Sequence, residues 1–355
     1  MQRSARKVQV CSVLAVALIA LGSECPNTDP MGNMNGNQNG NDNTSSARLF
    51  VVNNVTSITS HSNPATITGN VAPTTELPAG AATDIFQPRG IAVTDTNVLI
   101  VARQNGGLSL HDNALTATGN TAANRIVDGA ATGLGAPIAL AYDAANDRLF
   151  VGNINAAEGI LVFENVSQAA FNGNIAPTRK FNPPDRSPSN ATDMTIDAMC
   201  LDAQGRLYVS DSSGLNQNTS RILRFDNPGT ASGETIPNGL VTSLSWGGIE
   251  DICVDSGDRL YVVDDSDEIE VLDNASTLNV LVTPNRTIKI NGSSIALRGI
   301  VVDSAGRGFV ADTGNSDILI LLNIGALTGT INPNDSIAGS DTELSAPRHM
   351  ALVEG

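Results

Sequence analysis

Seven titratable side chains recur at two corresponding places in a repeating sequence. Five of them stand two positions before a recurring apolar residue: Arg89, Asp197, Glu250, Arg298 and Arg348. Two stand one position before it: Asp251 and His349. An arginine grips a carboxylate or a phosphate through two parallel hydrogen bonds, and carboxylates bind hard cations such as Ca²⁺. If the fold gathers these residues, they form a polar pocket for a small anionic or carbohydrate ligand.

The recurring apolar residue marks the units of the repeat. It is found at Ile91, Leu140, Met199, Ile252, Ile300 and Met350, at intervals of 48 to 59 residues. In five units a short turn and a second apolar run follow: LIVA, LFVG, LYVS, LYVV and GFVA. A third, alternating run closes on an asparagine, at Asn113, Asn165, Asn227, Asn274 and Asn323, and a weaker fourth segment often carries proline. Four antiparallel strands per unit of this length are typical of the blade of a β-propeller.

The two ends of the repeating region complete one another. The segment PRHMALVEG at 347–355 is a first strand with no second, and ARLFVVNN at 47–54 is a second strand with no first. NVAPTTEL at 70–77 supplies a fourth. We therefore predict an all-β, six-bladed propeller over residues 47–355, built from four-stranded antiparallel blades, in which the two ends pair within one blade. First strands line the channel of a propeller, so the seven titratable residues should meet at one mouth.

The units starting at Met199, Ile252 and Ile300 read MCLDAQGRLYVSD, ICVDSGDRLYVVDD and IVVDSAGRGFVAD. This pattern resembles the NHL-repeat family of β-propellers, whose unit has an apolar strand ending in Asp, a Gly turn and a second strand of the LYVAD type. The unit at Ile91 resembles it least, because Thr94 stands at the acidic position. The resemblance implies the propeller fold and a binding role in an exported bacterial protein. Propellers host many unrelated functions, so the site must decide the function.

The N-terminus predicts export. Arg3, Arg6 and Lys7 form a basic start, and an uncharged apolar run at 8–21 follows, which is too short for a comfortable membrane span. We interpret residues 1–24 as a signal peptide. The predicted location is the bacterial cell envelope, either periplasmic or at the surface.

Cys25 stands where a bacterial lipoprotein carries its acylated cysteine, but Glu24 occupies a position that normally holds Gly, Ala or Ser. Lipidation of Cys25 and ordinary cleavage without acylation therefore both stay open. The Asn/Gly-rich segment 25–46 has no apolar period and is predicted to be a disordered tether. Membrane contact is expected only through a lipid anchor.

Composition limits the partners. The chain of 355 residues has 20 basic and 36 acidic side chains, a formal charge of −16, which would repel a nucleic-acid backbone. We expect no nucleic acid, and either a small anionic or carbohydrate ligand or another envelope protein at the mouth.

Two function classes fit the predicted mouth. The first is a binding or scaffold module without a cofactor. The second is a metal-dependent hydrolase, because lactonase propellers of the gluconolactonase type hold calcium at this mouth, and Asp197, Glu250 and Asp251 are similar in type and place to their ligands. Three arginines in the same ring would compete with the ion. A purely structural interpretation pairs Glu250 with Arg298 across neighbouring blades, and no catalytic residue can be assigned.

Cys200 and Cys253 occupy the same position in adjacent units, where the other units carry Ala or Val. Packed sheets stand about 10 Å apart, which is beyond the reach of a disulfide. We predict that both are buried free thiols.

Overall fold

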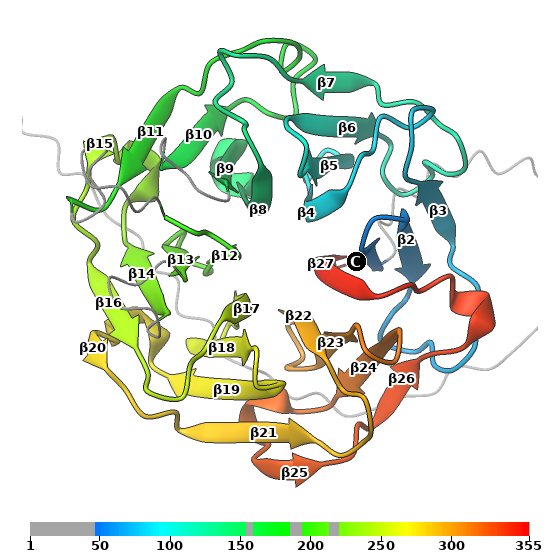
Figure 1. The fold of residues 1–355 in the computed structure, drawn as a ribbon, viewed down its shortest axis with the longest axis vertical. Coiled ribbons are helices and arrows are strands. Elements are labelled where there is room, and N and C mark those ends of the chain that lie inside the picture. Colours follow the sequence, from blue (N-terminus) through cyan, green and yellow to red (C-terminus); the bar gives the residue numbers. More distant parts are fainter. Residues whose placement is uncertain (1–46, 154–158, 185–193, 213–219, 355) are drawn as a thin grey trace, which may run out of the picture. The chain divides into compact units, whose positions relative to one another are not determined.

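A computed structural model describes residues 47–153, 159–184, 194–212 and 220–354, all within one compact unit that spans Thr44–Gly355. Six sheets surround a central channel (Figure 1), so the predicted six-bladed propeller is confirmed. The predicted signal peptide, the tether and Cys25 lie outside the described residues. Within the described ranges, no helix is long and apolar enough to cross a membrane.

Each blade runs outward from an inner strand. The closing blade contains β27 (Pro347–Val353), β1 (Arg48–Asn53), β2 (Ser57–Ser62) and β3 (Thr75–Pro78). The next contains β4 (Pro88–Val93), β5 (Val98–Arg103), β6 (Leu108–Asp112) and β7 (Arg125–Val127). Then follow β8 (Pro137–Asp143), β9 (Arg148–Asn153), β10 (Ile160–Glu164) and β11 (Arg179–Asn182).

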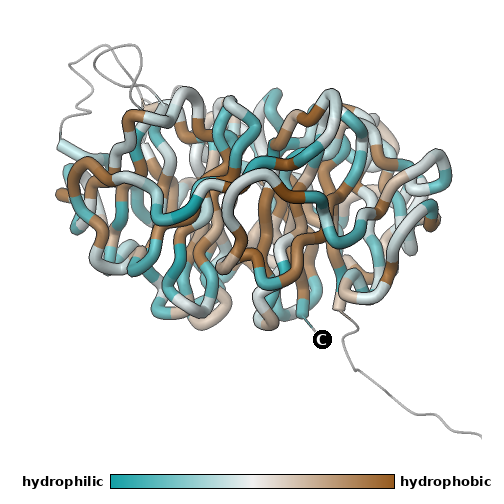
Figure 2. Tube along the Cα trace, turned by 90° about the horizontal axis from the view of Figure 1, so that it is seen from below, coloured by the Kyte–Doolittle hydropathy of each residue, from teal (hydrophilic) through white to brown (hydrophobic). Residues whose placement is uncertain are grey.

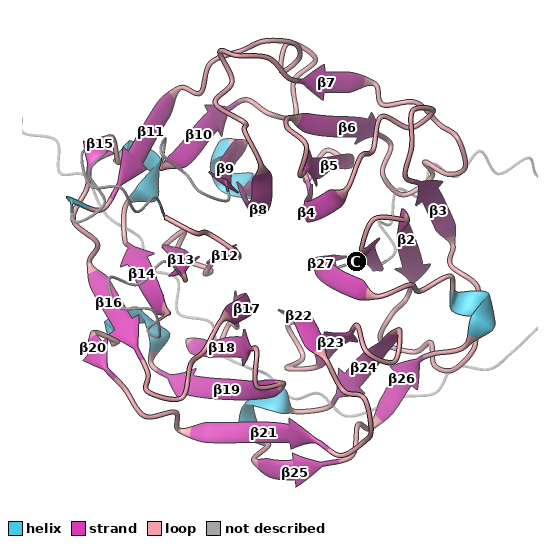
Figure 3. Ribbon diagram, viewed as in Figure 1, coloured by secondary structure: helices cyan, strands magenta, loops and turns pink. Residues whose placement is uncertain are grey.

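The remaining three blades follow the same order. They contain β12 (Met199–Leu201), β13 (Leu207–Asp211), β14 (Arg221–Phe225) and β16 (Gly239–Thr242); then β17 (Ile249–Val254), β18 (Arg259–Asp264), β19 (Glu268–Asp273) and β21 (Arg286–Ile290); and finally β22 (Leu297–Val302), β23 (Gly308–Asp312), β24 (Asp317–Leu321) and β26 (Asp335–Ile337). The helical segments of the described chain are short 3₁₀ turns (Figure 3): Ala144–Asn146, Pro228–Thr230, Ala275–Thr277, Ile324–Ala326 and Ser340–Thr342.

The ring is closed by the two ends of the described chain. β27 pairs antiparallel with β1, with Met350 opposite Val51 and Leu352 opposite Leu49. Figure 1 shows the C-terminal strand in red beside the blue N-terminal strands. This is the predicted closure, and it removes the two free sheet edges that an open array would leave.

The core lies between the blades. In β5, Val98 and Ile100 pack toward the following blade, while Leu99 and Val101 pack toward the closing blade. Alternate residues of a strand point to opposite faces, so a strand that is apolar throughout must be covered on both sides. In the side view of Figure 2, brown hydrophobic stretches run along the strands and teal segments occupy many of the turns.

The segment between the third and fourth strands reaches across to the preceding blade, and we call it the strap. Three straps form a fifth, parallel strand there: β15 (Gly233–Glu234), β20 (Val280–Leu281) and β25 (Gly329–Ile331). Bridges from Gly69 to Ile337 and from Gly173 to Val127 stand at the same place in two other blades. The predicted four-stranded blades are therefore extended to five strands in three cases. The prolines of the predicted fourth segments, such as Pro177, lie in the strap and not in the strand.

A residue of left-handed backbone stands six positions before every fourth strand. Five blades have glycine there, with φ of 63° to 78°: Gly69, Gly119, Gly173, Gly233 and Gly329. The sixth has Val280, at φ 80° and 65% exposed. A β-branched residue rarely adopts this backbone, so Val280 is a strained exception to the repeat.

The recurring Asp–turn–Arg sequence forms an ion pair within each turn. Asp255 accepts hydrogen bonds from Arg259 Nε at 2.8 Å, from the Tyr261 hydroxyl at 2.8 Å and from the Gly257 N–H at 2.9 Å. Equivalent pairs join Asp143 to Arg148, Asp202 to Arg206 and Asp303 to Arg307. These turns lie at the end of the blades away from the predicted mouth, and their charges stabilise the fold.

Candidate functional site

Inner strands are bulged where they reach the mouth. Glu250 is the extra residue between the pairs Ile249–Asp264 and Asp251–Val263. Arg298 and Ile138 are extra residues in the same sense, and β4 and β27 shift register around Arg89 and Arg348. A β-bulge re-aims the side chain of the inserted residue. The bulges thus set the direction of the ring of side chains that the repeat predicts at the mouth.

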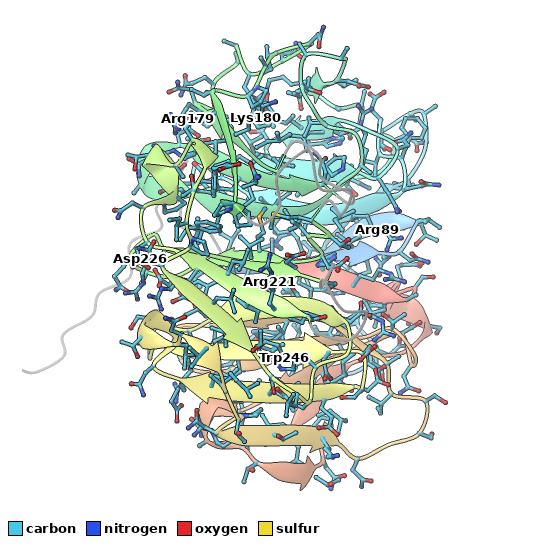
Figure 4. All side chains as sticks on the ribbon, turned by 60° about the vertical axis from the view of Figure 1, so that its left-hand side comes forward. Arg89, Arg179, Lys180, Arg221, Asp226 and Trp246 are labelled. Atoms are coloured by element: carbon cyan, nitrogen blue, oxygen red, sulfur yellow. The ribbon has the colours of Figure 1, made fainter. Side chains whose placement is uncertain are left out.

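Asp197 completes this ring just before β12. The Ser210 N–H donates to the Ala198 carbonyl at 3.0 Å, and the Ser212 N–H donates to the Thr195 carbonyl at 3.0 Å. Between these two hydrogen bonds, Ile196 and Asp197 lie opposite the single residue Asp211, so the chain is bulged here as well. Inner strands contact their neighbours in the order β27, β4, β8, β12, β17, β22, so the ring reads Arg348, Arg89, Ile138, Asp197, Glu250, Arg298. Three arginines come from consecutive blades, and Figure 4 labels Arg89 among them.

Arg298 is engaged within the protein. Its Nε lies 3.6 Å from Glu250 Oε1, and its Nη1 lies 3.3 Å from Asp267 Oδ1 and 2.6 Å from the carbonyl of Leu297. The structural interpretation of the Glu250–Arg298 pair is therefore confirmed. Burial raises the pKa of Glu250, and the positive charges of Arg298 and Arg348 counteract this shift.

Arg348 is not neutralised in this way. Among the described residues, no carboxylate lies within salt-bridge distance of its guanidinium, and its buried Nε has no hydrogen-bond partner. Burial and the neighbouring charges of Arg89 and Arg298 lower the pKa of Arg348, and the negative charge of Glu250 opposes this shift. Arg89 donates from Nε to Gln104 Oε1 at 2.8 Å, a neutral partner. Arg348 and Arg89 thus form a positive arc without a salt bridge to any carboxylate of the described residues, and Glu250 is the acidic residue that acts on Arg348 from a distance.

Asp197 is the corresponding acidic case. Its Oδ2 accepts a hydrogen bond from the Ser212 hydroxyl at 2.9 Å. No cationic side chain of the described ranges forms a salt bridge with it. Burial raises the pKa of Asp197 to about 6, and the negative charge of Glu250 acts in the same direction.

A cavity of about 150 Å³ lies in the channel next to this ring. Its lining includes Asp197, Asp251 and His349, together with the apolar residues that mark the repeat. His349 Nδ1 lies 3.9 Å from Asp251 Oδ1, which is too far for a hydrogen bond. Burial lowers the pKa of His349 to about 4, so its imidazole is neutral near pH 7 and forms no ion pair with Asp251.

Asp251 connects neighbouring inner strands. It accepts a hydrogen bond from the Ile252 N–H at 2.9 Å and one from the Ile300 N–H of the next blade at 2.9 Å. Burial raises the pKa of Asp251 to about 7. Each of its oxygens is occupied by a backbone donor. Among the described residues, no three His, Cys, Asp or Glu side chains are grouped as a metal ion requires, so Asp197, Glu250 and Asp251 are not brought together as one ligand set.

Cys200 and Cys253 also line the cavity. Both are free, as predicted, but they are half-buried, since the channel reaches them. The backbone N–H groups of Val254 and Val302 hydrogen-bond to their sulfurs, and burial raises the pKa of both thiols. These cysteines join neighbouring inner strands in the same way as Asp251.

Two glycines allow the inner strands to approach one another. A β-carbon on Gly299 would lie 2.0 Å from the Arg348 carbonyl oxygen, and one on Gly90 would lie 2.5 Å from the Ile138 carbonyl oxygen. Backbone atoms cannot yield as a flexible side chain can. Sequence reasoning missed this role, although a glycine directly after the ring residue in both units was the available signal.

Comparisons with known proteins support the fold. One similar structure is the crystal structure of a nidogen/laminin complex, with a TM-score of 0.56 and 13% identity over 86% of this chain and 98% of that chain. Another is a protein of unknown function from Bacteroides caccae, with a TM-score of 0.55 and 11% identity over 88% of this chain and 100% of that one. At such identities the likeness shows the propeller fold alone. No family model and no curated protein matches the chain, so the NHL resemblance remains a hypothesis.

Proposed function

We propose that this protein is an exported binding module whose channel mouth takes a small anion on Arg348 and Arg89. The observation that carries the proposal is Arg348, whose buried Nε lacks a partner while two further arginines stand beside it. A half-buried guanidinium without a salt-bridge partner is costly, and an anionic ligand in contact with it lowers that cost. The propeller fold supports a binding role in general.

The location is also proposed. The basic start, the short apolar run and Cys25 support export to the bacterial cell envelope, with lipidation of Cys25 as the means of retention. One similar structure is named for a nidogen/laminin complex, which gives an example of this architecture in a protein complex.

Calorimetric titration of the purified protein with acetate and with inorganic phosphate tests the proposal. We expect at least one anion to bind, and we expect Arg348→Met to lose that binding. Arg307→Met is the matched control, because Arg307 pairs with Asp303 in a turn at the other end of its blade. Arg348→Lys keeps the positive charge and serves as the second variant if Arg348→Met does not fold.

The possible results of these titrations bear on different parts of the proposal. Binding that survives Arg348→Met in a folded protein would contradict the proposed site, and no anion binding to the wild type would contradict the proposed function. Calcium binding lost in Glu250→Gln would instead favour the metal-dependent hydrolase, and binding of an envelope protein without any small anion would favour a scaffold.

A further inference from the structure

Two opposite charges stand on opposite sides of the ring of inner strands. In the ring of six inner strands Arg348 and Asp197 stand three positions apart, so they come from opposite blades. Neither has an oppositely charged side chain within salt-bridge distance among the described residues, and they do not pair with each other. All other titratable positions of the ring differ: Glu250 and Arg298 pair together, and Arg89 is held by Gln104.

This arrangement is unusual for an acidic protein. Half-buried charges are normally held in ion pairs, because removing a charge from water is costly. Here Arg348 and Asp197 have no salt bridge within the described residues, Asp197 is held by the neutral Ser212 hydroxyl, and a cavity of about 150 Å³ lined in part by Asp197 lies next to the ring. A single ligand with a negative and a positive end would compensate both charges at once.

Resting on the proposed function, we infer that the ligand is a small zwitterion of the amino-acid class. Its carboxylate would meet Arg348, with Arg89 beside it, and its ammonium would meet Asp197. Ile138 lies between Arg89 and Asp197 in the ring and offers an apolar contact to the carbon skeleton.

The cavity limits the part of the ligand that meets Asp197. An apolar cavity of about 150 Å³ in another protein holds a molecule as small as benzene. The lining of the present cavity includes Asp197 and Ile138 but neither arginine, so it has room for the ammonium end of a compact ligand, whose carboxylate would lie outside it at Arg348. The ammonium group is the feature that separates this class from simple anions and from sugar acids.

Three molecules of nearly equal shape test the inference: L-alanine, L-lactate and propionate carry an ammonium, a hydroxyl or a hydrogen at the same carbon. We expect alanine to bind about tenfold more tightly than propionate, with lactate between them, since a favourable charge contact of this kind corresponds to about one power of ten. 4-Aminobutyrate against butyrate repeats the test at a longer charge separation.

Variants at the acidic side then locate the effect. Asp197→Asn should remove the preference for the aminated member of each pair and leave binding of the plain carboxylate unchanged. Asp341→Asn is the matched control, because Asp341 is exposed in the connection before β27. The preference should survive in that variant.

Failure of the inference and failure of the proposed function give different results. If propionate, lactate and alanine bind equally, and butyrate matches 4-aminobutyrate, the mouth binds anions but the zwitterion is wrong. If none of the five binds while phosphate or acetate does, the zwitterion is also wrong. If no anion binds at all, the proposed function falls as well. An alanine preference that persists in Asp197→Asn would overturn the assignment of the ammonium to Asp197.

Discussion

Charged residues are arranged differently at the two ends of the blades, the turn end and the mouth. At the turn between the first and second strands, acid and base belong to the same blade and pair in the same manner in four blades, as Asp255 and Arg259 do. At the mouth, the charges come from five of the six blades and differ from blade to blade, since the ring position of β8 is the apolar Ile138. There Arg348 and Asp197 have no oppositely charged partner among the described side chains.

This difference separates structure from function. The ion pair of the turn recurs in four of the six blades, because these blades share the same turn and fold in the same way. A binding site is needed once, so the residues that we propose for it are expected to differ from blade to blade. The mouth is therefore the more informative end, although it holds fewer ion pairs.

The largest expected effect is that of Gly299→Ala. The new β-carbon would collide with the Arg348 carbonyl and push β22 from β27. Overpacking against backbone should lower the free energy of unfolding by about 3 kcal/mol and abolish anion binding. Urea denaturation and calorimetry measure the two effects. Gly135→Ala is the control, since a β-carbon on Gly135 would meet no atom within 4 Å and its backbone is not left-handed.

Asp255→Asn examines the turn end. It weakens the hydrogen bonds from Arg259 and Tyr261, so we expect a loss of about 2 kcal/mol in the free energy of unfolding. Anion affinity should stay unchanged, because the turn lies away from the mouth. A parallel loss of binding would show that the two ends are coupled and would undo the comparison.

The pH dependence of binding sharpens the role of Asp197. Since its pKa is raised to about 6, it becomes protonated as the pH falls and no longer offers a negative charge to an ammonium group. Alanine affinity should fall about tenfold between pH 7.5 and about pH 5, while propionate affinity should not fall in parallel. Titrations at several pH values measure this difference. In Asp197→Asn the difference between alanine and propionate should no longer change over the same range, whereas titration of Asp251, which lines the same cavity, would affect both ligands alike.

Val280→Gly tests whether the strap requires a glycine at the position six residues before the fourth strand. Glycine adopts the left-handed backbone of position 280 without the steric strain of valine. We expect this gain to outweigh the greater conformational freedom of glycine in the unfolded chain, so the free energy of unfolding should rise by about 1 kcal/mol. Gly329→Val, at the matching position, should lose stability. If both changes are neutral, the glycine position of the strap carries no structural requirement.

The sequence was sufficient to predict the fold. Six recurrences of an apolar residue, from Ile91 to Met350, predicted six inner strands, and the unmatched first and second strands at the two ends predicted the closing pair. Repetition makes such inferences secure, because an error in one unit is corrected by five others. The Glu250–Arg298 pair was predicted for the same reason, since neighbouring units place equivalent residues side by side.

The choice between paired and unpaired arginines was beyond the sequence. Asp267 and Gln104, which engage Arg298 and Arg89, come from turns after second strands and follow no common spacing. The bulges and the close approach at Gly299 are likewise local backbone features without a periodic pattern. The strap was assigned to the fourth strand because its proline suits an edge strand, whereas the partner of the strap lies in another blade.

Ring closure and the binding arginine depend on the same element. β27 completes the last sheet by pairing with β1, and it also carries Arg348 and His349. A chain in which this strand is undocked would lack the inner strand of its closing sheet and also Arg348, on which the proposed anion site depends. If that proposal holds, anion affinity would also report whether β27 is docked.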